Sequence, residues 1–202
     1  MSLRDTLPER SALEAALELE VADASGANVK FGSIFAEQKT VVVFIRHFFC
    51  GSCQSYVQHL ASVPDAALES AGTKIVLIGC GQWQALKYYA ETTGFRGAIY
   101  AESTLQLYRA LGMDLQNTAL TPSGQKKANY VTRGLLSNVW HSIKTGPIKA
   151  PSLIGKQGNA SQLGGDFIFG PGDQCTFAHR MQHTEDHIEA ADLMKAAGVT
   201  LT

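Results

Sequence analysis

Two uninterrupted apolar runs stand out from the mixed pattern of hydrophobic and polar positions along the chain. Residues 41–45 (VVVFI) and 74–79 (KIVLIG) are rich in β-branched side chains and lack the alternation of a half-exposed strand. Such runs are typical of strands that are buried on both faces. Stretches with helical spacing follow each run, and this succession predicts an α/β fold in which helices flank a central mixed, mostly parallel sheet.

Periodicity and turn residues place the remaining elements. They predict an N-terminal helix at 8–20, a strand–turn–strand stretch at 21–38, helices at 54–62, 82–93, 104–111 and 184–197, a short strand at 99–101, and a hairpin formed by 166–169 and 174–178. Residues 112–162 are irregular, with one helix expected at 135–143. We interpret them as an insertion in a single domain whose core comprises 20–111 and 163–202, and long insertions of this kind are often functional.

Composition fits an ordinary globular domain. The 202 residues are 45% hydrophobic and 17% charged, with a formal net charge of -1. A core of this size needs no metal or disulfide, and no basic field would attract nucleic acid or anionic lipid. The N-terminus is charged, unlike a secretory signal, and the apolar runs are far shorter than the ~20 residues of a membrane span. We therefore expect a cytoplasmic protein without a membrane span, in which cysteines stay reduced.

The most specific chemical motif is a CxxC at Cys50 and Cys53, placed where the first buried strand ends and a helix begins. Unpaired amides at a helix N-terminus favour negative charge by about 0.3–1 kcal/mol, which lowers the pKa of a thiol. The two-residue spacing lets the second sulfur attack a mixed disulfide on the first. Arg46 and His47 lie beside the motif and add positive charge, so the pattern predicts thiol redox chemistry.

Two other interpretations of these cysteines remain open. They are two packed core residues, or they are half of a zinc site, although Cys80, Cys175 and the six histidines supply no second ligand pair. Cys80 follows the second buried strand, and it is either a third thiol near the pair or a small buried hydrophobe. Cys175 is expected to be a packing residue.

A polar cluster precedes the last predicted helix. It contains His179, Arg180, His183, Asp186 and His187. In one interpretation it forms a wall of the site, with Arg180 binding an anion or peroxide and Asp186 orienting His187. In the other, it caps and charges a helix start. The aromatic residues Trp83, Tyr88 and Trp140 similarly line a small-molecule pocket or belong to the core.

The run VVVFIRHFFCGSCQSYVQHLA resembles the peroxiredoxin-like 2 family, in its branch of AhpC/TSA antioxidant-enzyme-domain proteins. The stretches IVLIG, IYAESTLQLYRALGM, GLLSNVWHSI and QLGGDFIFGPG resemble the same family in the same order, so the likeness covers roughly residues 20–200. This resemblance implies a thioredoxin-like, peroxiredoxin-like fold. It also implies a thiol oxidoreductase that reduces a peroxide, endoperoxide or disulfide, holds no bound cofactor and is recycled by thioredoxin or glutathione.

The sequence departs from both parent patterns of that family. On the peroxiredoxin pattern of Pro, Thr and peroxidatic Cys, the three positions are Arg46, Cys50 and Cys53, which makes Cys53 the nucleophile. On thioredoxin logic the nucleophile is Cys50, which we favour, and Cys53 resolves. Gly164 stands with Gly165 where thioredoxins carry a cis-proline, and glycines there let the backbone approach the site closely.

These arguments lead to one set of expected site residues and to several rival functions. Cys50, Cys53 and Arg46 are expected to be catalytic, and His47, Phe49, Gly164, Gly165 and Arg180 to contact the substrate, with no metal. A non-catalytic alternative is a redox-sensing or partner-binding module that uses 112–162 as its recognition surface. Another is a pathway-specific enzyme for a reactive metabolite. A homodimer is compatible with each of these functions.

Overall fold

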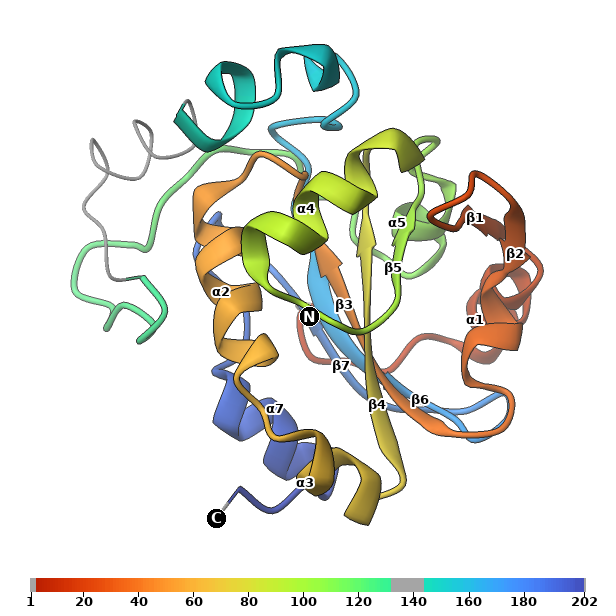
Figure 1. Cartoon of the computed structure of the whole chain (residues 1–202). Coiled ribbons are helices and arrows are strands. Elements are labelled where there is room, and N and C mark those ends of the chain that lie inside the picture. Colours follow the sequence, from red (N-terminus) through yellow and green to blue (C-terminus); the bar gives the residue numbers. More distant parts are fainter. Residues whose placement is uncertain (1–2, 132–143, 202) are drawn as a thin grey trace.

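One mixed sheet runs through the middle of the molecule (Figure 1). The computed structural model describes residues 3–131 and 144–201, and within them seven strands follow the spatial order β2-β1-β5-β4-β3-β6-β7. Strands β3, β4 and β5 are parallel to one another, and the strands beside them, β6 and β1, run antiparallel to them. The strands are β1 (Glu20–Ala22), β2 (Asn28–Lys30), β3 (Lys39–Ile45), β4 (Thr73–Gly79), β5 (Ile99–Ala101), β6 (Gly165–Phe169) and β7 (Cys175–Arg180).

Helices cover both faces of this sheet (Figure 1). Side chains of α2, α3, α4 and α7 form the core on one face, and those of α1 and α5 form the core on the other. The helices are α1 (Arg10–Leu17), α2 (Gly51–Ala61), α3 (Asp65–Ser70), α4 (Leu86–Thr93), α5 (Gln106–Ala110) and α7 (Ala190–Ala196). Nowhere in the described part of the chain is a helix long and apolar enough to span a bilayer.

The first apolar run of the sequence lies in β3 and contributes to the core on both faces of the sheet. Val41 and Val43 pack beneath α2, whereas Val42 and Phe44 pack on the opposite face of the sheet. All four are completely buried. Because β3 is paired along its length with β4 on one side and β6 on the other, the predicted burial of both faces is confirmed. The end of β3 is thereby a rigid support for the cysteine motif that follows it.

Several helices are shorter than their hydrophobic spacing predicts. α1 ends at Leu17 because Glu20 already pairs with Lys30 in the β1–β2 hairpin. α5 begins only at Gln106 because Leu105, directly before it, has a φ of 62°, which is incompatible with a helix. In both cases pairing or backbone geometry outside the helix overrides its intrinsic propensity.

The later part of the inserted segment, residues 144–160, lies over the ends of β3 and β4, at the top of Figure 1. The backbone N–H of Phe48 donates to the carbonyl of Gln157 (2.9 Å), and that of Gln82 donates to the carbonyl of Lys156 (2.8 Å). The segment contains a π-helical turn at Lys144–Ile148 and a 3-10 turn at Pro151–Leu153. The helix expected at 135–143 lies outside the described residues. The insertion thus covers the edge of the sheet at which the parallel strands finish.

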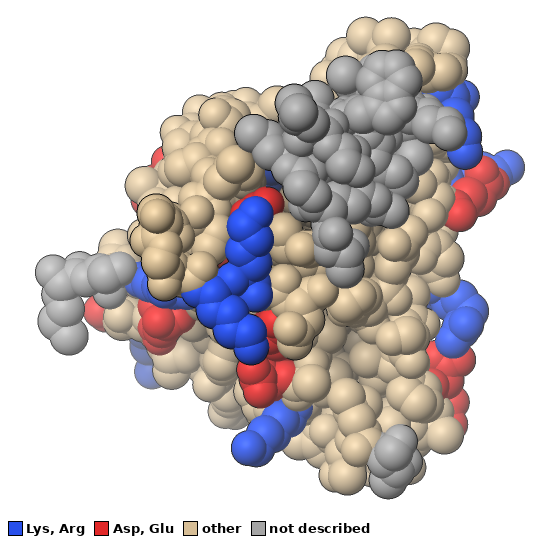
Figure 2. Space-filling view, turned by 90° about the vertical axis from the view of Figure 1, so that its left-hand side faces the viewer, with Lys and Arg blue, Asp and Glu red and all other residues tan. Residues whose placement is uncertain are grey.

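Charged side chains of both signs are mixed on the face of the molecule that Figure 2 shows. Lys and Arg lie beside Asp and Glu there, and most of this face is uncharged. Surface ion pairs include Lys30 with Glu18 (2.6 Å) and Arg96 with Asp65 (3.1 Å), and all four side chains are largely exposed. The face in Figure 2 therefore presents no extended field of a single sign.

The close approach of β6 to β3 gives a test of the fold. A Cβ added to Gly164 would lie 1.8 Å from the carbonyl oxygen of Phe44, which cannot move without displacing the central strand. We expect Gly164→Ala to lower the free energy of unfolding by about 3 kcal/mol or more, as overpacking of a rigid core does. Gly172→Ala is the control, because its φ of 77° is strained for alanine but nothing lies within 4 Å of the added carbon.

The control should cost about 1–3 kcal/mol through backbone strain alone. Urea unfolding followed by circular dichroism measures both values. Equal unfolding midpoints for wild type and Gly164→Ala would show that β3 and β6 do not approach as closely as described.

Candidate active site

The two cysteines of the CxxC lie on the first turn of α2, directly after the buried end of β3. Cys50 is the N-cap residue of the helix, and its Sγ accepts a hydrogen bond from the backbone N–H of Cys53 (3.5 Å). Both cysteines are unbonded. Cys50 retains 4% of its surface exposed and Cys53 retains none. The helix N-terminus therefore supports Cys50 as expected, but the structure buries both sulfurs more deeply than a surface motif would be.

The surroundings of Cys50 favour its thiolate. The hydrogen bond from the Cys53 side chain, the nearby Arg46 guanidinium and His47 together lower the pKa of Cys50 well below its usual range, against the opposing effect of burial. Arg46 Nη1 donates to Cys50 Sγ over 3.2 Å, while Nη2 donates to the carbonyl of Ala160 in the insertion. Both terminal nitrogens of the Arg46 guanidinium are thus held by hydrogen bonds, and its positive charge lies beside the Cys50 sulfur.

Cys53 has the opposite electrostatic environment. Burial, its hydrogen bond to Cys50 and the negative charge of Cys50 raise the pKa of Cys53 well above the usual value. The surroundings of the pair therefore favour ionisation of Cys50 and keep the proton on Cys53. Burial lowers the pKa of His47, while the negative charge of Cys50 opposes that effect.

A buried histidine lies on the far side of Cys53. His187 Nε2 is 3.9 Å from Cys53 Sγ, and His187 Nδ1 is 3.0 Å from the carboxylate of Asp166. The Tyr56 ring, one turn along α2 from Cys53, stacks on the imidazole with centroids 4.3 Å apart and planes 5° from parallel. Tyr56 also donates to Asp166 over 3.3 Å. Cys53, the His187 imidazole and the Asp166 carboxylate thus form a row in space, in which the imidazole lies between the sulfur and the carboxylate.

The contacts around His187 explain why the last helix, α7, starts later than its sequence predicts. The backbone N–H of His187 donates to Tyr130 Oη (2.9 Å), and that of Ile188 donates to Asp166 Oδ2 (3.0 Å). Because these amides bond to side chains rather than to carbonyls four residues back, the chain stays irregular until Ala190.

The partner of His187 is therefore Asp166, and the one of the two interpretations in which Asp186 orients His187 is wrong. Asp186 accepts instead from Arg4 (2.9 Å) and from the backbone N–H of Gln182 (2.7 Å). Sequence reasoning missed Asp166, and the available signal was a single carboxylate within the otherwise apolar strand 165–169.

The other expected substrate contacts divide into two groups. Phe49 lies next to the motif and is nearly buried, with its ring against Gly146 of the insertion. Gly164 packs against the main chain of β3 at Phe44, and because it has no side chain it lets β6 approach β3 closely. Gly165 is the first residue of β6. Arg180 is not brought to the cysteines.

Arg180 is held by a separate set of partners. Its guanidinium donates to the carbonyls of Leu111 (2.6 Å), Leu3 (2.6 Å) and Thr6 (2.7 Å), and it lies 5.4 Å above the Phe167 ring. Phe167 belongs to the core on the face opposite the cysteine pair. In this arrangement Arg180 ties the N-terminal segment to the sheet.

The surroundings of the other two cysteines, Cys80 and Cys175, favour the protonated thiol. Cys80 Sγ donates to the carbonyl of Arg46 (2.7 Å), and burial raises the pKa of Cys80 to about 12. Burial likewise raises the pKa of Cys175 to about 11. In the described part of the chain, no three His, Cys, Asp or Glu side chains are grouped to hold a metal ion.

Two of the three aromatic residues considered as a pocket lie in the described part of the chain. Trp83 is 39% exposed and covers Gly26 in the β1–β2 turn. Tyr88 packs partly buried against the core beneath α4. Trp140 lies outside the described residues.

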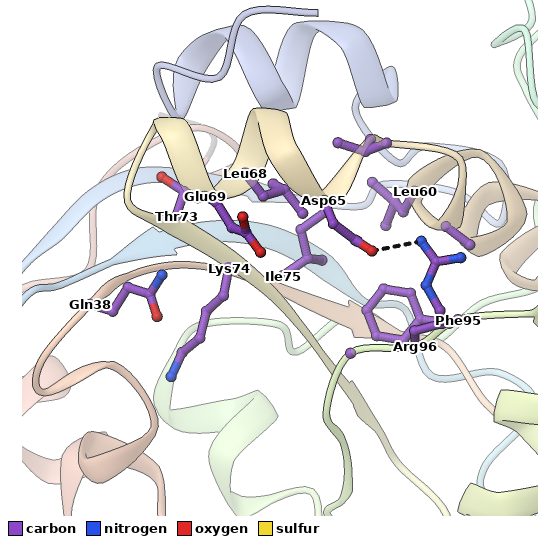
Figure 3. Close-up of a pocket in the computed structure, with 13 residues that line it drawn as sticks. Gln38, Leu60, Asp65, Leu68, Glu69, Thr73, Lys74, Ile75, Phe95 and Arg96 are labelled. Atoms are coloured by element: carbon purple, nitrogen blue, oxygen red, sulfur yellow. Dashed lines mark hydrogen bonds and ion pairs between the residues drawn. The ribbon is translucent and has the colours of Figure 1, made fainter.

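A surface cavity of about 410 Å³ lies at the opposite end of the sheet (Figure 3). It is lined at the start of β4 by Thr73 and Ile75, and the ion pair of Asp65 with Arg96 lies across one side of it. The cysteines instead follow the finishing end of the parallel strands. This cavity therefore does not contribute to the cysteine site.

Comparison with known proteins relates this geometry to a family. The family model for the AhpC/TSA antioxidant enzyme matches residues 59–183, a stretch that begins after the two cysteines. Peroxiredoxin-like 2C from Mus musculus is 36% identical over 188 residues, covering 92% of this chain and 80% of that protein. Prostamide/prostaglandin F synthase from Xenopus laevis is 25% identical over 185 residues, covering 87% of this chain and 82% of that one.

A solved structure shows the fold. The peroxidoxin BcpB from Mycobacterium tuberculosis has a TM-score of 0.56 with this chain at 12% sequence identity, covering 89% of each. The predicted thioredoxin-like, peroxiredoxin-like fold is thereby confirmed.

The electrostatic role of Arg46 gives a testable consequence. Replacing Arg46 by Met removes the positive charge beside Cys50 Sγ, so the pKa of Cys50 rises and its thiolate forms only at higher pH. We expect the midpoint of the alkylation profile of Cys50 to move up by about one pH unit, which corresponds to ~1.4 kcal/mol of lost thiolate stabilisation. Arg46→Lys, which keeps the charge, should move it less. Iodoacetamide labelling from pH 5 to 10, read peptide by peptide by mass spectrometry, measures each midpoint, and identical midpoints in all three proteins would contradict the assignment.

Proposed function

The chain belongs to the AhpC/TSA antioxidant enzyme family, and from this premise we propose that it is a thiol-dependent oxidoreductase that uses Cys50 and Cys53 as a redox pair. One observation carries the proposal. Both cysteines lie on the first turn of one helix with Arg46 Nη1 3.2 Å from Cys50 Sγ, and these surroundings lower the pKa of Cys50 while that of Cys53 is raised. This difference between the two thiols is the electronic requirement for a nucleophile and its resolving partner.

For a hydroperoxide, the reaction proceeds in two steps. The Cys50 thiolate attacks the terminal peroxide oxygen, the O–O bond breaks, and the alkoxide leaves as an alcohol after taking a proton, so Cys50 becomes a sulfenic acid. Cys53 then attacks the Cys50 sulfur, the S–O bond breaks, and water leaves as the disulfide forms. An external dithiol of the thioredoxin type, or glutathione, returns both cysteines to the reduced state by exchange.

The assignment of roles follows from the charges around each sulfur. Cys50 has Arg46 Nη1 at 3.2 Å, which stabilises a negative charge before and during attack. Cys53 is completely buried and its pKa is raised. This difference supports the thioredoxin-like assignment, in which Cys50 attacks, over the peroxiredoxin-like one, in which Cys53 would attack.

The route to Cys50 is proposed to run past the insertion. Phe49 and Gly146 are in contact beside the motif, and the Ala160 carbonyl accepts from Arg46. Because only 4% of Cys50 is exposed, a substrate larger than a small peroxide needs this contact to open. Phe49 and His47 are the described side chains placed to meet such a substrate.

An endoperoxide is the second candidate substrate. The relatives named prostamide/prostaglandin F synthase share 24–27% identity with this chain. Thiol reduction of an endoperoxide breaks the same O–O bond and yields two hydroxyl groups with the same Cys50–Cys53 disulfide. The two substrate classes therefore require the same residues and differ only in the space beside Phe49.

A redox-sensing module without turnover is the alternative that the burial of both sulfurs favours. Slow access would allow one oxidation for each molecule without efficient recycling. Titration of free thiols before and after peroxide, together with a thioredoxin-reductase-coupled assay, separates the two. Stoichiometric oxidation without repeated turnover would favour the sensor.

Cysteine variants test the enzyme assignment directly. Cys50→Ser should reduce turnover of cumene hydroperoxide, coupled to thioredoxin, thioredoxin reductase and NADPH, to background, because the nucleophile is lost. Cys53→Ser should accumulate a sulfenic acid at Cys50 or a mixed disulfide with the reductant, detectable as a mass increase on the intact protein. Cys80→Ser keeps the donor to the Arg46 carbonyl and is the matched control, which should retain activity within about twofold. Full activity in both Cys50→Ser and Cys53→Ser would refute the redox assignment.

A further inference from the structure

The contacts of Asp166 define which nitrogen of His187 carries the proton. Asp166 is completely buried, and its carboxylate accepts from Tyr56, from His187 Nδ1 and from the backbone N–H of Ile188. An ionised carboxylate can only accept hydrogen bonds, so the proton between it and the imidazole belongs to Nδ1. In the neutral imidazole this leaves His187 Nε2 as the unprotonated acceptor, 3.9 Å from Cys53 Sγ.

The imidazole is also held rigidly in that orientation. Tyr56 stacks on one face of it (4.3 Å), and the backbone of His187 donates to Tyr130 Oη (2.9 Å). A base that is oriented by a third group and cannot rotate is the arrangement in which proton transfer from a sulfur or oxygen nucleophile is efficient. No element of the proposed peroxide chemistry at Cys50 requires these contacts.

His187 lies beside a surface cavity. The cavity has a volume of about 430 Å³ and is lined also by Lys126, Lys127, Glu185, Glu189 and Asp192. The imidazole itself is 1% exposed, so the base is shielded from bulk water. The described lining of the cavity includes neither cysteine of the pair.

We propose that His187, oriented by Asp166, is the catalytic base that removes the proton from Cys53 when this sulfur attacks oxidised Cys50. In this step the Cys53 S–H bond breaks and its proton moves to His187 Nε2. The sulfur's electron pair forms the S–S bond, and the group on Cys50 departs with the electrons of the bond that held it. Asp166 is a positioning residue that stabilises the imidazolium. What oxidises Cys50 is a question for the proposed function, on which this inference rests.

The timing of the transfer follows from the charge on Cys50. In the reduced pair, the Cys53 proton is held by its hydrogen bond to the Cys50 thiolate, whose charge also opposes ionisation of Cys53. Once Cys50 carries oxygen or a thiol, its negative charge is gone and both effects disappear. Burial alone then keeps Cys53 protonated, and His187 is the acceptor within reach. The base thus acts only after the first step has taken place.

The groups facing His187 from every packed element agree with this role. Cys53 and Tyr56 face it from α2, Asp166 from β6 and Tyr130 from the insertion, while Asp186 precedes it in the chain. Burial raises the pKa of both tyrosines, so they remain neutral. Among these groups the carboxylate of Asp166 is the anion that bonds to the ring.

The experiment separates the two thiol steps with one probe, 4,4′-dithiodipyridine. In a Cys80→Ser, Cys175→Ser background, Cys50 is loaded with one equivalent of probe in acid, and the pH is then raised in a stopped-flow instrument. Attack by Cys53 releases the second 4-thiopyridone, which absorbs near-ultraviolet light. We expect His187→Gln to slow this second release about 10²-fold at pH 7, a typical contribution of a general base, while the loading step changes less than twofold.

Two further variants keep a structural role distinguishable from a chemical one. Asp166→Asn should slow the second release about tenfold, because the imidazolium loses its counter-charge. His183→Gln is the matched control, since it is a buried histidine in the same segment that faces Asp186 (3.7 Å) rather than Cys53, and it should leave both steps unchanged. For His187→Gln, the rate should recover towards wild type near pH 10, where hydroxide replaces the base, and a mere packing defect would show no such recovery.

Two outcomes would overturn the inference. One is an unchanged second release in folded His187→Gln, and the other is equal slowing of both steps. If the variants do not fold, the wild-type profile decides: a plateau of the second rate through neutral pH supports the base, whereas a tenfold rise for each pH unit from 6 to 9 excludes it. Because the probe replaces the natural oxidant, absence of peroxide turnover with intact second release would refute only the proposed function.

Discussion

The negative charge on a buried sulfur is the feature on which the other properties of the site depend. A thiolate at Cys50, with 4% of its surface in contact with solvent, has lost most of its hydration and must be stabilised by the protein itself. The structure supplies the Cys53 hydrogen bond, Arg46 and the helix N-terminus. Each of these is fixed by something larger, since Arg46 follows the central strand and also bonds to the insertion at Ala160.

Much of this frame follows from the sequence. The apolar run that ends at Ile45 predicts a strand buried on both faces, and a CxxC directly after it lies at a helix start for reasons of chain continuity alone. The proximity of Arg46 to Cys50 is equally local, because the two residues are four positions apart in the chain. These predictions succeed because strand burial and helix capping are determined by neighbouring residues and the hydrophobic pattern.

Contacts between distant residues could not be predicted in the same way. The contact of His187 with Asp166 depends on the pairing of β6 with β3, which brings residues 21 positions apart to the same buried point beneath α2. Arg180 shows the opposite case. Its charge and position suggested a contact with substrate, but its guanidinium donates to backbone carbonyls near the N-terminus. Residue type indicates what a side chain can do, whereas strand order decides which partner it reaches.

The arrangement divides two opposing electrostatic demands between two sides of one helix turn. A nucleophile requires a nearby cation to keep its proton away, and a resolving thiol requires a base to take its proton at a later moment. Different groups bond to the two sulfurs, although the charge of Arg46 also lowers the pKa of Cys53 against the larger effect of burial. Here Arg46 bonds to Cys50, whereas the imidazole backed by the Asp166 carboxylate lies 3.9 Å from Cys53. The hydrogen bond between the sulfurs links the two sides, and oxidation of Cys50 removes that bond, so the charge change of the first step prepares the second.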